Sequence, residues 1–291
     1  MAFQTILLYL STIAIWGSTW LVITFQLGSV DPIISVIYRM AIASFALFCF
    51  CRWRGIKLRA SRQDQYFFLI QGVLSFGINF WCIYLSELYL TSGIIAVIFS
   101  LIVFFNIING RIFLGRPIER NTIFGGLIGL SGLTLLFYPE LIRMDDNEQA
   151  IKGLILALIA VTSASLGNMA ATRSGLRGLS VWQINAWSTA YGAIALVVIA
   201  LATGSKFTFE PSVEYVSSLL YLSLFGTIFA FGAYLKLMVE IGPEKASYGA
   251  LLIPFVAIML STLFEGYQWT IIAVIGFAAA LAGNYLVMRQ P

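Results

Sequence analysis

The polar residues of this chain that could handle a substrate are neutral and lie in the middle of long apolar segments. Asn79, Ser165 and Asn168 are examples, whereas the acidic residues lie near segment ends and histidine is absent. An enzyme in a membrane needs proton-transfer groups, an activated nucleophile or metal ligands facing a cavity. Amides and hydroxyls can bind a substrate or join helices by hydrogen bonds, but they do not titrate. We therefore predict no enzymatic activity, no metal site and no cofactor.

One charged residue is a candidate for substrate binding. Arg39 lies about two turns into an apolar segment, and an ionisable residue within a membrane is a functional candidate by default. Its guanidinium could balance a substrate carboxylate or pair with a carbonyl at a helix end. Arg39 and Lys236, which lies near the end of another segment, could instead extend to lipid headgroups. We include Arg39, and not Lys236, in the predicted site.

Aromatic residues supply the other candidates. Trp16 falls near the centre of its segment, far from the interfacial belt where tryptophan usually lies, and Trp20 follows one turn later. A cavity wall explains a central tryptophan better than exposure to lipid does. Tyr84, Trp187 and Tyr248 are further candidates for the same wall.

Three residues mark places where helices can bend. Gly77 and Gly226 interrupt two apolar segments, and Pro254 lacks the N–H that would continue a helix. We predict hinges at these positions, with close helix packing as the alternative explanation.

The segments that carry these residues predict a membrane protein. Hydrophobic residues make up 60% of the chain and charged residues 10%, with a mean hydropathy of +0.92. A hydrocarbon core of about 30 Å requires about 20 apolar residues of helix, and continuous apolar runs favour helices over barrel strands. We predict an all-α fold with ten transmembrane helices at about 3–25, 32–51, 66–86, 90–110, 121–138, 151–172, 181–203, 214–236, 245–264 and 268–288.

The distribution of charge predicts the orientation. With the N-terminus inside, the cytoplasmic segments contain twelve lysines and arginines and the outer ones contain three. The positive-inside rule therefore places both termini in the cytoplasm. Five of these residues lie between Arg52 and Arg62, where anionic lipid headgroups explain them better than a nucleic acid does. We expect membrane lipid as a partner and no nucleic acid.

The two halves of the chain resemble each other in sequence. A shift of 151 residues superimposes Gly125 and Gly132 on Gly276 and Gly283. Because five helices in each half is an odd number, the second copy must be inverted, which is typical of secondary transporters with a substrate site near the midplane. We predict a central cavity between two repeats and the following division: a first repeat over 1–140, a periplasmic linker over 141–150 and a second repeat over 151–291.

Two short motifs extend this interpretation to a family. The ten segments, the stretch Trp16-Gly17-Ser18-Thr19-Trp20 and the turn Leu114-Gly115-Arg116-Pro117 resemble the drug/metabolite transporter superfamily in its ten-helix EamA branch. The chain is most similar to aromatic amino-acid exporters of the YddG type. Arg116 and Tyr267 stand where that family usually has glutamate. The resemblance implies export of aromatic and other neutral amino acids across the bacterial inner membrane by alternating access.

Two alternatives remain open. A drug or other metabolite exporter would share the fold, although phosphate recognition requires several cationic groups facing the cavity. A non-transporting membrane scaffold would have a filled seam in place of a cavity. For any of these functions we expect the chain to act as a monomer or a weak dimer.

Overall fold

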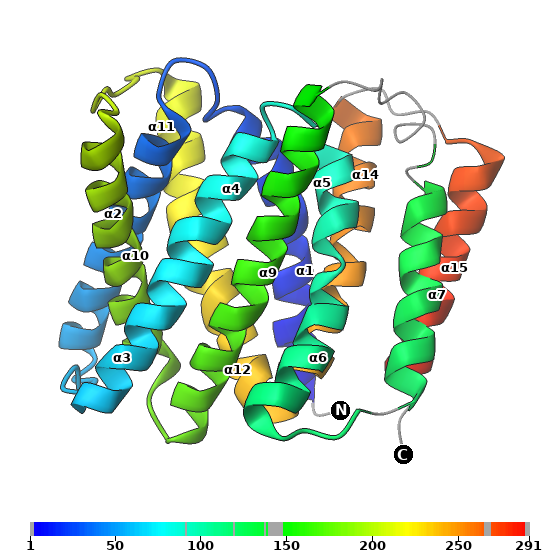
Figure 1. The fold of residues 1–291 in the computed structure, drawn as a ribbon, viewed down its shortest axis with the longest axis horizontal. Helices are drawn as coiled ribbons and strands as arrows, with labels where there is room; N and C mark the ends of the chain where they lie inside the picture. Colours follow the sequence, from blue (N-terminus) through cyan, green and yellow to red (C-terminus); the bar gives the residue numbers. More distant parts are fainter. Residues whose placement is uncertain are drawn as a thin grey trace.

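The protein is built from helices that run side by side between two opposite ends of the molecule (Figure 1). The computed structural model describes residues 3–90, 92–118, 120–136, 138, 148–264 and 269–288, and all regular structure within them is helical, as predicted. Six stretches in these residues are long and apolar enough to cross a membrane: Gln4–Thr24, Pro32–Trp53, Arg62–Ser86, Ile151–Leu176, Val181–Thr203 and Val213–Ile241. Residues 141–147 of the predicted linker and Tyr267 lie outside the described residues.

The N-terminal part of the chain contains seven α-helices and one π-helix among its described residues. They are α1 (Phe3–Thr24), α2 (Pro32–Trp53), α3 (Arg62–Gln71), the π-helix η1 (Gly72–Ile78), α4 (Asn79–Ser86), α5 (Ser92–Phe99), α6 (Ile102–Leu114) and α7 (Arg120–Leu136). Asp31 caps α2 by accepting a hydrogen bond from the backbone N–H of Ile33, and Pro32 occupies the first helical position, where no N–H is needed.

The C-terminal part repeats this order of elements. They are α9 (Glu148–Leu176), α10 (Val181–Thr203), α11 (Val213–Tyr221), the π-helix η2 (Leu222–Phe229), α12 (Ala230–Ile241), α13 (Pro243–Ser247), the 3₁₀-helix η3 (Tyr248–Leu251), α14 (Ile253–Phe264) and α15 (Ile271–Met288).

The two π-helices lie at matching places in the two parts. η1 begins at Gly72 and η2 begins at Leu222, 150 residues later, and each interrupts an otherwise continuous helix. Gly77 lies in η1 and Gly226 in η2, so the predicted interruptions are confirmed, while their role as hinges stays a prediction. A π-turn widens the helix and is found mostly at functional sites. In η2 the Thr227 hydroxyl donates to the Leu222 carbonyl over 3.0 Å.

Two of the predicted segments, 90–110 and 245–264, are not single continuous helices. The first divides into α5 and α6 at Ser100, whose hydroxyl donates to the Ala96 carbonyl over 2.9 Å, a contact that bends helices. The second divides into α13, η3 and α14. Pro254 is the second residue of α14, directly after the 3₁₀ turn, because it cannot supply the N–H of a continuous α-helix.

α7 and α15 pack through glycines. A Cβ atom added at Gly132 would lie 2.6 Å from the Gly276 carbonyl oxygen, and one added at Gly283 would lie 2.5 Å from the Gly125 carbonyl oxygen. Gly132 and Gly283 are 151 residues apart, as are Gly125 and Gly276. Equivalent positions of the two parts therefore meet twice, Gly132 with Gly276 and Gly283 with Gly125. Two copies related by a two-fold axis form this contact pattern.

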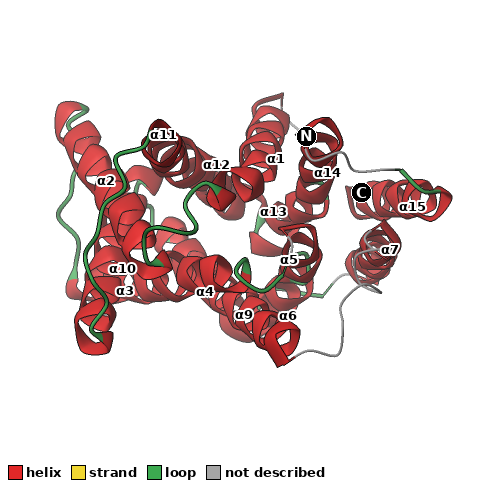
Figure 2. Cartoon of the chain, turned by 90° about the horizontal axis from the view of Figure 1, so that it is seen from above, coloured by secondary structure: helices red, strands yellow, loops and turns green. Residues whose placement is uncertain are grey.

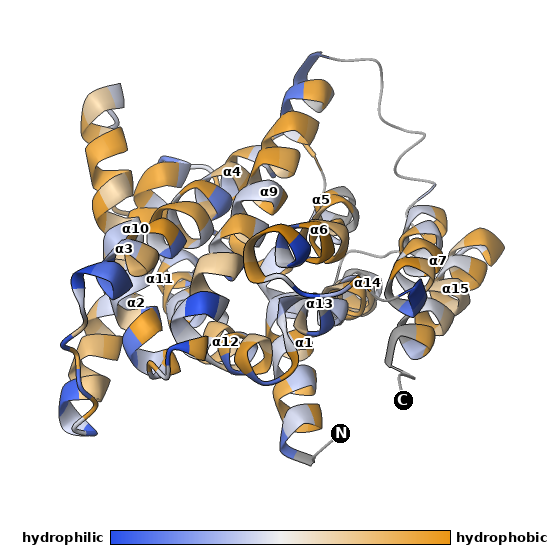
Figure 3. Cartoon of the chain, turned by 60° about the horizontal axis from the view of Figure 1, so that its bottom comes forward, coloured by the Kyte–Doolittle hydropathy of each residue, from blue (hydrophilic) through white to orange (hydrophobic). Residues whose placement is uncertain are grey.

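The most hydrophilic residues are frequent at the ends of the helices and in the connections. Figure 3 shows hydrophobic residues along the lengths of the helices and the strongest hydrophilic colour at several helix ends and connections. α1 begins and α15 ends at the lower edge of Figure 1. The described connections 54–61, 115–118 and 177–180 at this edge carry five lysines and arginines, whereas among the described connections at the upper edge only Lys206 is basic.

Candidate functional site

A cavity lies between the N-terminal and C-terminal parts of the chain. About 870 Å³ of space not occupied by atoms lies among its lining residues, with the open solvent at its mouth included. Viewed from above, α1, α12 and α14 lie on one side of the centre of the molecule, and α4, α5 and α9 lie on the other (Figure 2). The lining residues come from both parts: Tyr9, Thr12, Trp16, Thr19, Trp20, Ile23, Asn79, Phe80, Ile83, Ala96, Phe99, Ile102, Ala164, Asn168, Phe231, Tyr234, Leu237, Ala246, Gly249, Ala250 and Ile253.

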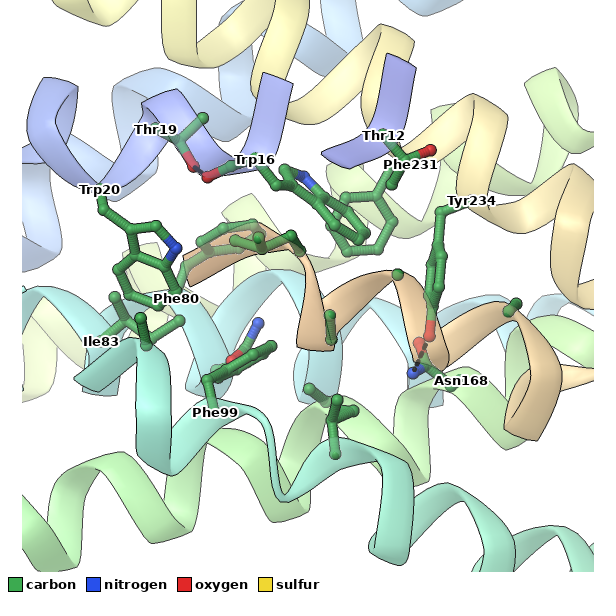
Figure 4. Close-up of a pocket in the computed structure, with 18 of the residues that line it drawn as sticks. Thr12, Trp16, Thr19, Trp20, Phe80, Ile83, Phe99, Asn168, Phe231 and Tyr234 are labelled. Carbon is green, nitrogen blue, oxygen red and sulfur yellow. Dashed lines mark hydrogen bonds between the residues drawn. The ribbon is translucent and has the colours of Figure 1, made fainter. Parts of the chain in front are cut away.

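Aromatic rings form much of the wall. The Trp16 ring lies edge-on to Phe231 and Tyr234 of α12, with centroids 5.2 and 5.0 Å away. Trp20 lies edge-on to Phe99 at 6.0 Å, on the other side of the cavity from Tyr234 (Figure 4). Such pairs are stabilising beyond the area they bury and hold the rings in fixed orientations. The cavity thus offers a rigid surface for a flat apolar side chain.

Two lining residues carry a buried polar atom without a hydrogen-bond partner. The Trp20 indole N–H and the Asn79 side-chain oxygen are buried and have no hydrogen-bond partner among the described residues. The Asn79 side-chain nitrogen donates to the Ser75 carbonyl over 3.1 Å, which fixes the orientation of the amide. A buried polar atom without a partner is costly, so one free donor and one free acceptor at a cavity wall indicate ligand contacts.

Helix α1 is attached to the π-helix η2 of the other part. The Trp16 indole N–H donates to the Gly226 carbonyl oxygen over 3.1 Å, and Asn185 of α10 donates to the neighbouring Thr227 carbonyl over 3.3 Å. The changed hydrogen bonding of the π-turn makes these carbonyls available to side chains. The cavity wall and the interruption at Gly226 are therefore mechanically connected.

Hydrogen bonds join several helices at the lower end of the cavity, the end toward the start of α1. Asn168 of α9 donates to the Tyr234 hydroxyl over 3.3 Å (Figure 4), and Asn106 of α6 donates to the Pro243 carbonyl over 3.3 Å. The Tyr9 hydroxyl of α1 donates to the Lys245 carbonyl of α13. The contacts of Tyr9 and Asn106 join helices of opposite parts, whereas Asn168 and Tyr234 both belong to the C-terminal part.

Comparison with known proteins identifies the family. The model of the EamA-like transporter family matches the chain twice, over residues 3–138 and 151–289. The chain belongs to the EamA-like transporter family. The uncharacterized inner membrane transporter YedA of Escherichia coli K12 is 30% identical over 286 residues, and the alignment covers 95% of this chain and 90% of that protein. The protein is therefore a membrane transporter.

More distant relatives of this EamA-like transporter also match it over almost its whole length. The uncharacterized transporter YoaV of Bacillus subtilis 168 is 23% identical over 286 residues, covering 95% of this chain and 94% of that protein. A protein of known crystal structure with 14% sequence identity superposes with a TM-score of 0.79, covering 97% of this chain and 95% of the other. That structure has the same fold over almost the whole chain.

In this EamA-like transporter, four of the nine residues predicted to bind substrate line the cavity. They are Trp16, Trp20, Asn79 and Asn168. Ser165 lies one turn before Asn168, fully buried, and its hydroxyl accepts a hydrogen bond from the Asn109 side chain over 2.9 Å. Ser165 therefore joins α9 to α6 beside the cavity.

Arg39 and Tyr84 form a layer behind the wall. Arg39 is 1% exposed and Tyr84 is 0% exposed, so neither reaches lipid headgroups. The Arg39 guanidinium carbon lies 4.2 Å above the ring of Phe80, whose own ring lines the cavity. Arg39 is thus separated from the cavity by an aromatic ring.

Trp187 and Tyr248 lie elsewhere. The Trp187 indole N–H donates to the Leu58 carbonyl over 2.9 Å and its ring packs edge-on against Phe48, away from the lining residues. Tyr248 is buried in η3, directly before the lining residue Gly249.

Several lining residues were missed from the sequence. Phe231 and Tyr234 lie one turn apart on α12, and Phe80 and Phe99 come from α4 and α5. One signal for α1 was available, because its lining positions recur at three and four residues, as one helical face requires. Nothing in the sequence distinguishes Phe99 from the other phenylalanines. Phe99 is the last residue of α5, so its position at the cavity depends on the break that follows, which was not predicted.

Proposed function

We propose that this protein is a secondary transporter that exports aromatic and other neutral amino acids across the inner membrane by alternating access. The observation that carries the proposal is the cavity between the two parts of the chain. Its wall is rich in aromatic rings, it offers the free polar atoms of Trp20 and Asn79, and none of its described lining residues is charged. Such a wall suits an apolar side chain on a molecule without net charge.

The proposed architecture is ten membrane-spanning segments in two inverted copies around this cavity. Three observations support it: the family model matches twice, the π-helices recur 150 residues apart, and α7 meets α15 through exchanged pairs of equivalent glycines. Placing the lower edge of Figure 1 in the cytoplasm puts most of the described basic connections there, with the start of α1 and the end of α15. The repeats would then cover 1–140 and 151–291.

Alternating access follows from the interrupted helices. We expect the segments around Gly77, Gly226 and Pro254 to change their bend while the α7 and α15 pair stays closed. The hydrogen bonds of Tyr9 and Asn168 would break as the cavity opens to the cytoplasm and re-form as it opens outward. A change of helical register at a π-turn needs few new contacts, because its hydrogen bonds already differ from those of an α-helix.

A drug or other metabolite with a large apolar surface is the second candidate substrate. The same aromatic wall favours it, since ring stacking does not require an amino or carboxylate group. A phosphorylated substrate fits less well, because phosphate binding uses several cationic groups. A scaffold function is disfavoured by the cavity itself. Action as a monomer or weak dimer, in contact with membrane lipid, stays a prediction.

Ligand-dependent thermal stabilisation of the purified protein tests the proposal. A ligand that binds only the folded state raises the free energy of unfolding in proportion to the logarithm of its concentration over Kd. We expect phenylalanine and tryptophan at concentrations about 100-fold above Kd to stabilise by about 2.7 kcal/mol. Glutamate and glucose 6-phosphate should have no effect. Stabilisation by a hydrophobic cation but not by phenylalanine would favour the drug exporter instead.

A further inference from the structure

Behind the cavity wall lies a set of buried polar groups that sequence reasoning did not bring together. Arg39 of α2 donates from Nε to the Thr227 hydroxyl over 3.0 Å, while its Nη1 atom is buried and has no hydrogen-bond partner. A guanidinium cannot lose its charge in a protein. A buried cation of this kind needs an anion nearby, because an unpaired charge in a low-dielectric interior costs several kcal/mol.

Glu87 is the residue that can supply this anion. It follows α4 directly and, like other residues near segment ends, looks exposed from the sequence, but both of its carboxylate oxygens are buried without a hydrogen-bond partner. Tyr84, one turn earlier, also has a buried hydroxyl without a partner. Phe80, Tyr84 and Glu87 follow one another at four and three residues, so they share the helix face on which Arg39 lies. The Arg39 guanidinium and the Glu87 carboxylate do not hydrogen-bond to each other directly.

This incomplete pair lies next to the cavity. The Phe80 ring that faces the cavity lies under the Arg39 guanidinium. A Cβ atom at Gly226 would lie 3.0 Å from Nη2 of Arg39 and 3.1 Å from Cγ2 of Thr19, a lining residue, so the glycine lets both approach. The Phe80 ring therefore lies between the Arg39 guanidinium and the cavity.

From this arrangement we propose that Arg39 and Glu87 form the subsite for the charged head group of a zwitterionic α-amino acid. The ammonium group binds the Glu87 carboxylate, the carboxylate binds the free side of the Arg39 guanidinium, and the side chain remains against the aromatic wall. The zwitterion then satisfies both buried charges at once, as charge-assisted hydrogen bonds do most strongly. This inference rests on the proposed function, and it adds Glu87 and a requirement for both charges of the substrate.

Isothermal titration calorimetry of the purified full-length protein with three ligands tests the subsite. Phenylalanine carries both charges, phenethylamine only the ammonium and 3-phenylpropionate only the carboxylate. Glu87→Gln should weaken phenylalanine and phenethylamine binding by at least about tenfold, the effect of losing one charge-assisted hydrogen bond, and leave 3-phenylpropionate unchanged. Arg39→Gln should weaken phenylalanine and 3-phenylpropionate and leave phenethylamine unchanged.

The control variants distinguish a loss of folding from a loss of binding at the subsite. They also distinguish failure of the subsite proposal from failure of the proposed function. Glu240→Gln, which removes a carboxylate from the partly exposed pair with Lys236 on α12, should bind all three ligands like the wild type. If a single variant fails to fold, the double variant Arg39→Gln/Glu87→Gln, which leaves neither charge unpaired, must lose the preference for phenylalanine over both analogues. If the wild type binds phenylalanine and Glu87→Gln binds it equally tightly, the proposed subsite is overturned and the proposed function is not. No binding of any of the three ligands by the wild type would overturn both proposals.

Discussion

The indole N–H of Trp16 donates a hydrogen bond to the carbonyl oxygen of Gly226 over 3.1 Å, which joins α1 to the π-turn of the other part of the chain. Trp16 was predicted from its central position to line a cavity, and Gly226 was predicted to interrupt a helix. The structure shows that the two features are in direct contact. A ligand that displaces Trp16 would therefore act directly on η2.

Replacing Trp16 with phenylalanine should destabilise the protein and slow transport. The variant keeps an aromatic ring but removes the donor to Gly226, at a cost of about 1 kcal/mol. Thermal unfolding in detergent measures the first effect and the initial rate of phenylalanine exchange in liposomes the second. Unchanged values for both would mean that the hydrogen bond has no role.

Trp20→Phe should weaken substrate binding without lowering the stability of the protein. The Trp20 N–H is buried without a partner, so its removal should leave the unfolding temperature unchanged or slightly higher. Phenylalanine affinity should fall about three- to tenfold if this donor contacts the substrate. Titration calorimetry compares the two proteins, and a lower unfolding temperature with unchanged affinity would assign Trp20 a structural role only.

Phe231→Leu should change the size of substrate that is accepted. Phe231 contacts Trp16, Phe76 and Phe80 in the wall, and the smaller side chain leaves room for a larger substrate ring. The ratio of tryptophan to phenylalanine transport should rise several-fold. Phe229→Leu, on the exposed side of η2 two residues earlier, is the matched control and should leave this ratio unchanged.

Tyr234→Phe should loosen the lower end of the cavity. The variant removes the hydroxyl that accepts hydrogen bonds from Asn106 and Asn168, and buried hydrogen bonds of this kind contribute about 1 kcal/mol each. Thr12→Cys, in a background without Cys49, Cys51 and Cys82, should then react faster with a membrane-impermeant thiol reagent added on the cytoplasmic side. A rate equal to that of the parent would argue against a gate at this level.

Gly132→Ala should destabilise the protein by about 1–3 kcal/mol, because the added methyl group would collide with the backbone of α15. Gly126→Ala on the same helix is the control, since its Cβ would lie at an ordinary distance of 3.5 Å from Phe104. Thermal unfolding should separate the two variants. Equal stability would show that α7 and α15 can move apart freely.

Much of the fold could be predicted because membrane-spanning helices have a fixed length and a continuous apolar composition. The ends of α1 and α10 agree with prediction to within one residue. The break at Ser100 could not be placed, because it depends on a local backbone contact that hydropathy does not report, whereas the break next to Pro254 lies where a bend was predicted. The π-turns were anticipated only as bends at two glycines.

The candidate site was less predictable. Trp16 could be found because a central tryptophan is unusual in a membrane helix. Trp187, in contrast, is explained by its hydrogen bond to Leu58, a tertiary contact that no spacing indicates. Glu87 was set aside as a residue near a segment end, because sequence position does not show how neighbouring helices enclose a carboxylate.

Counterflow in proteoliposomes tests the central claim most directly. Liposomes containing the protein are loaded with unlabelled phenylalanine and diluted into labelled phenylalanine, threonine, glutamate or a hydrophobic cationic dye. The account predicts transient accumulation of phenylalanine and threonine, none of glutamate or dye, and reduced phenylalanine accumulation by Trp16→Phe. Accumulation of the dye alone, or of none of the four compounds, would contradict amino-acid transport.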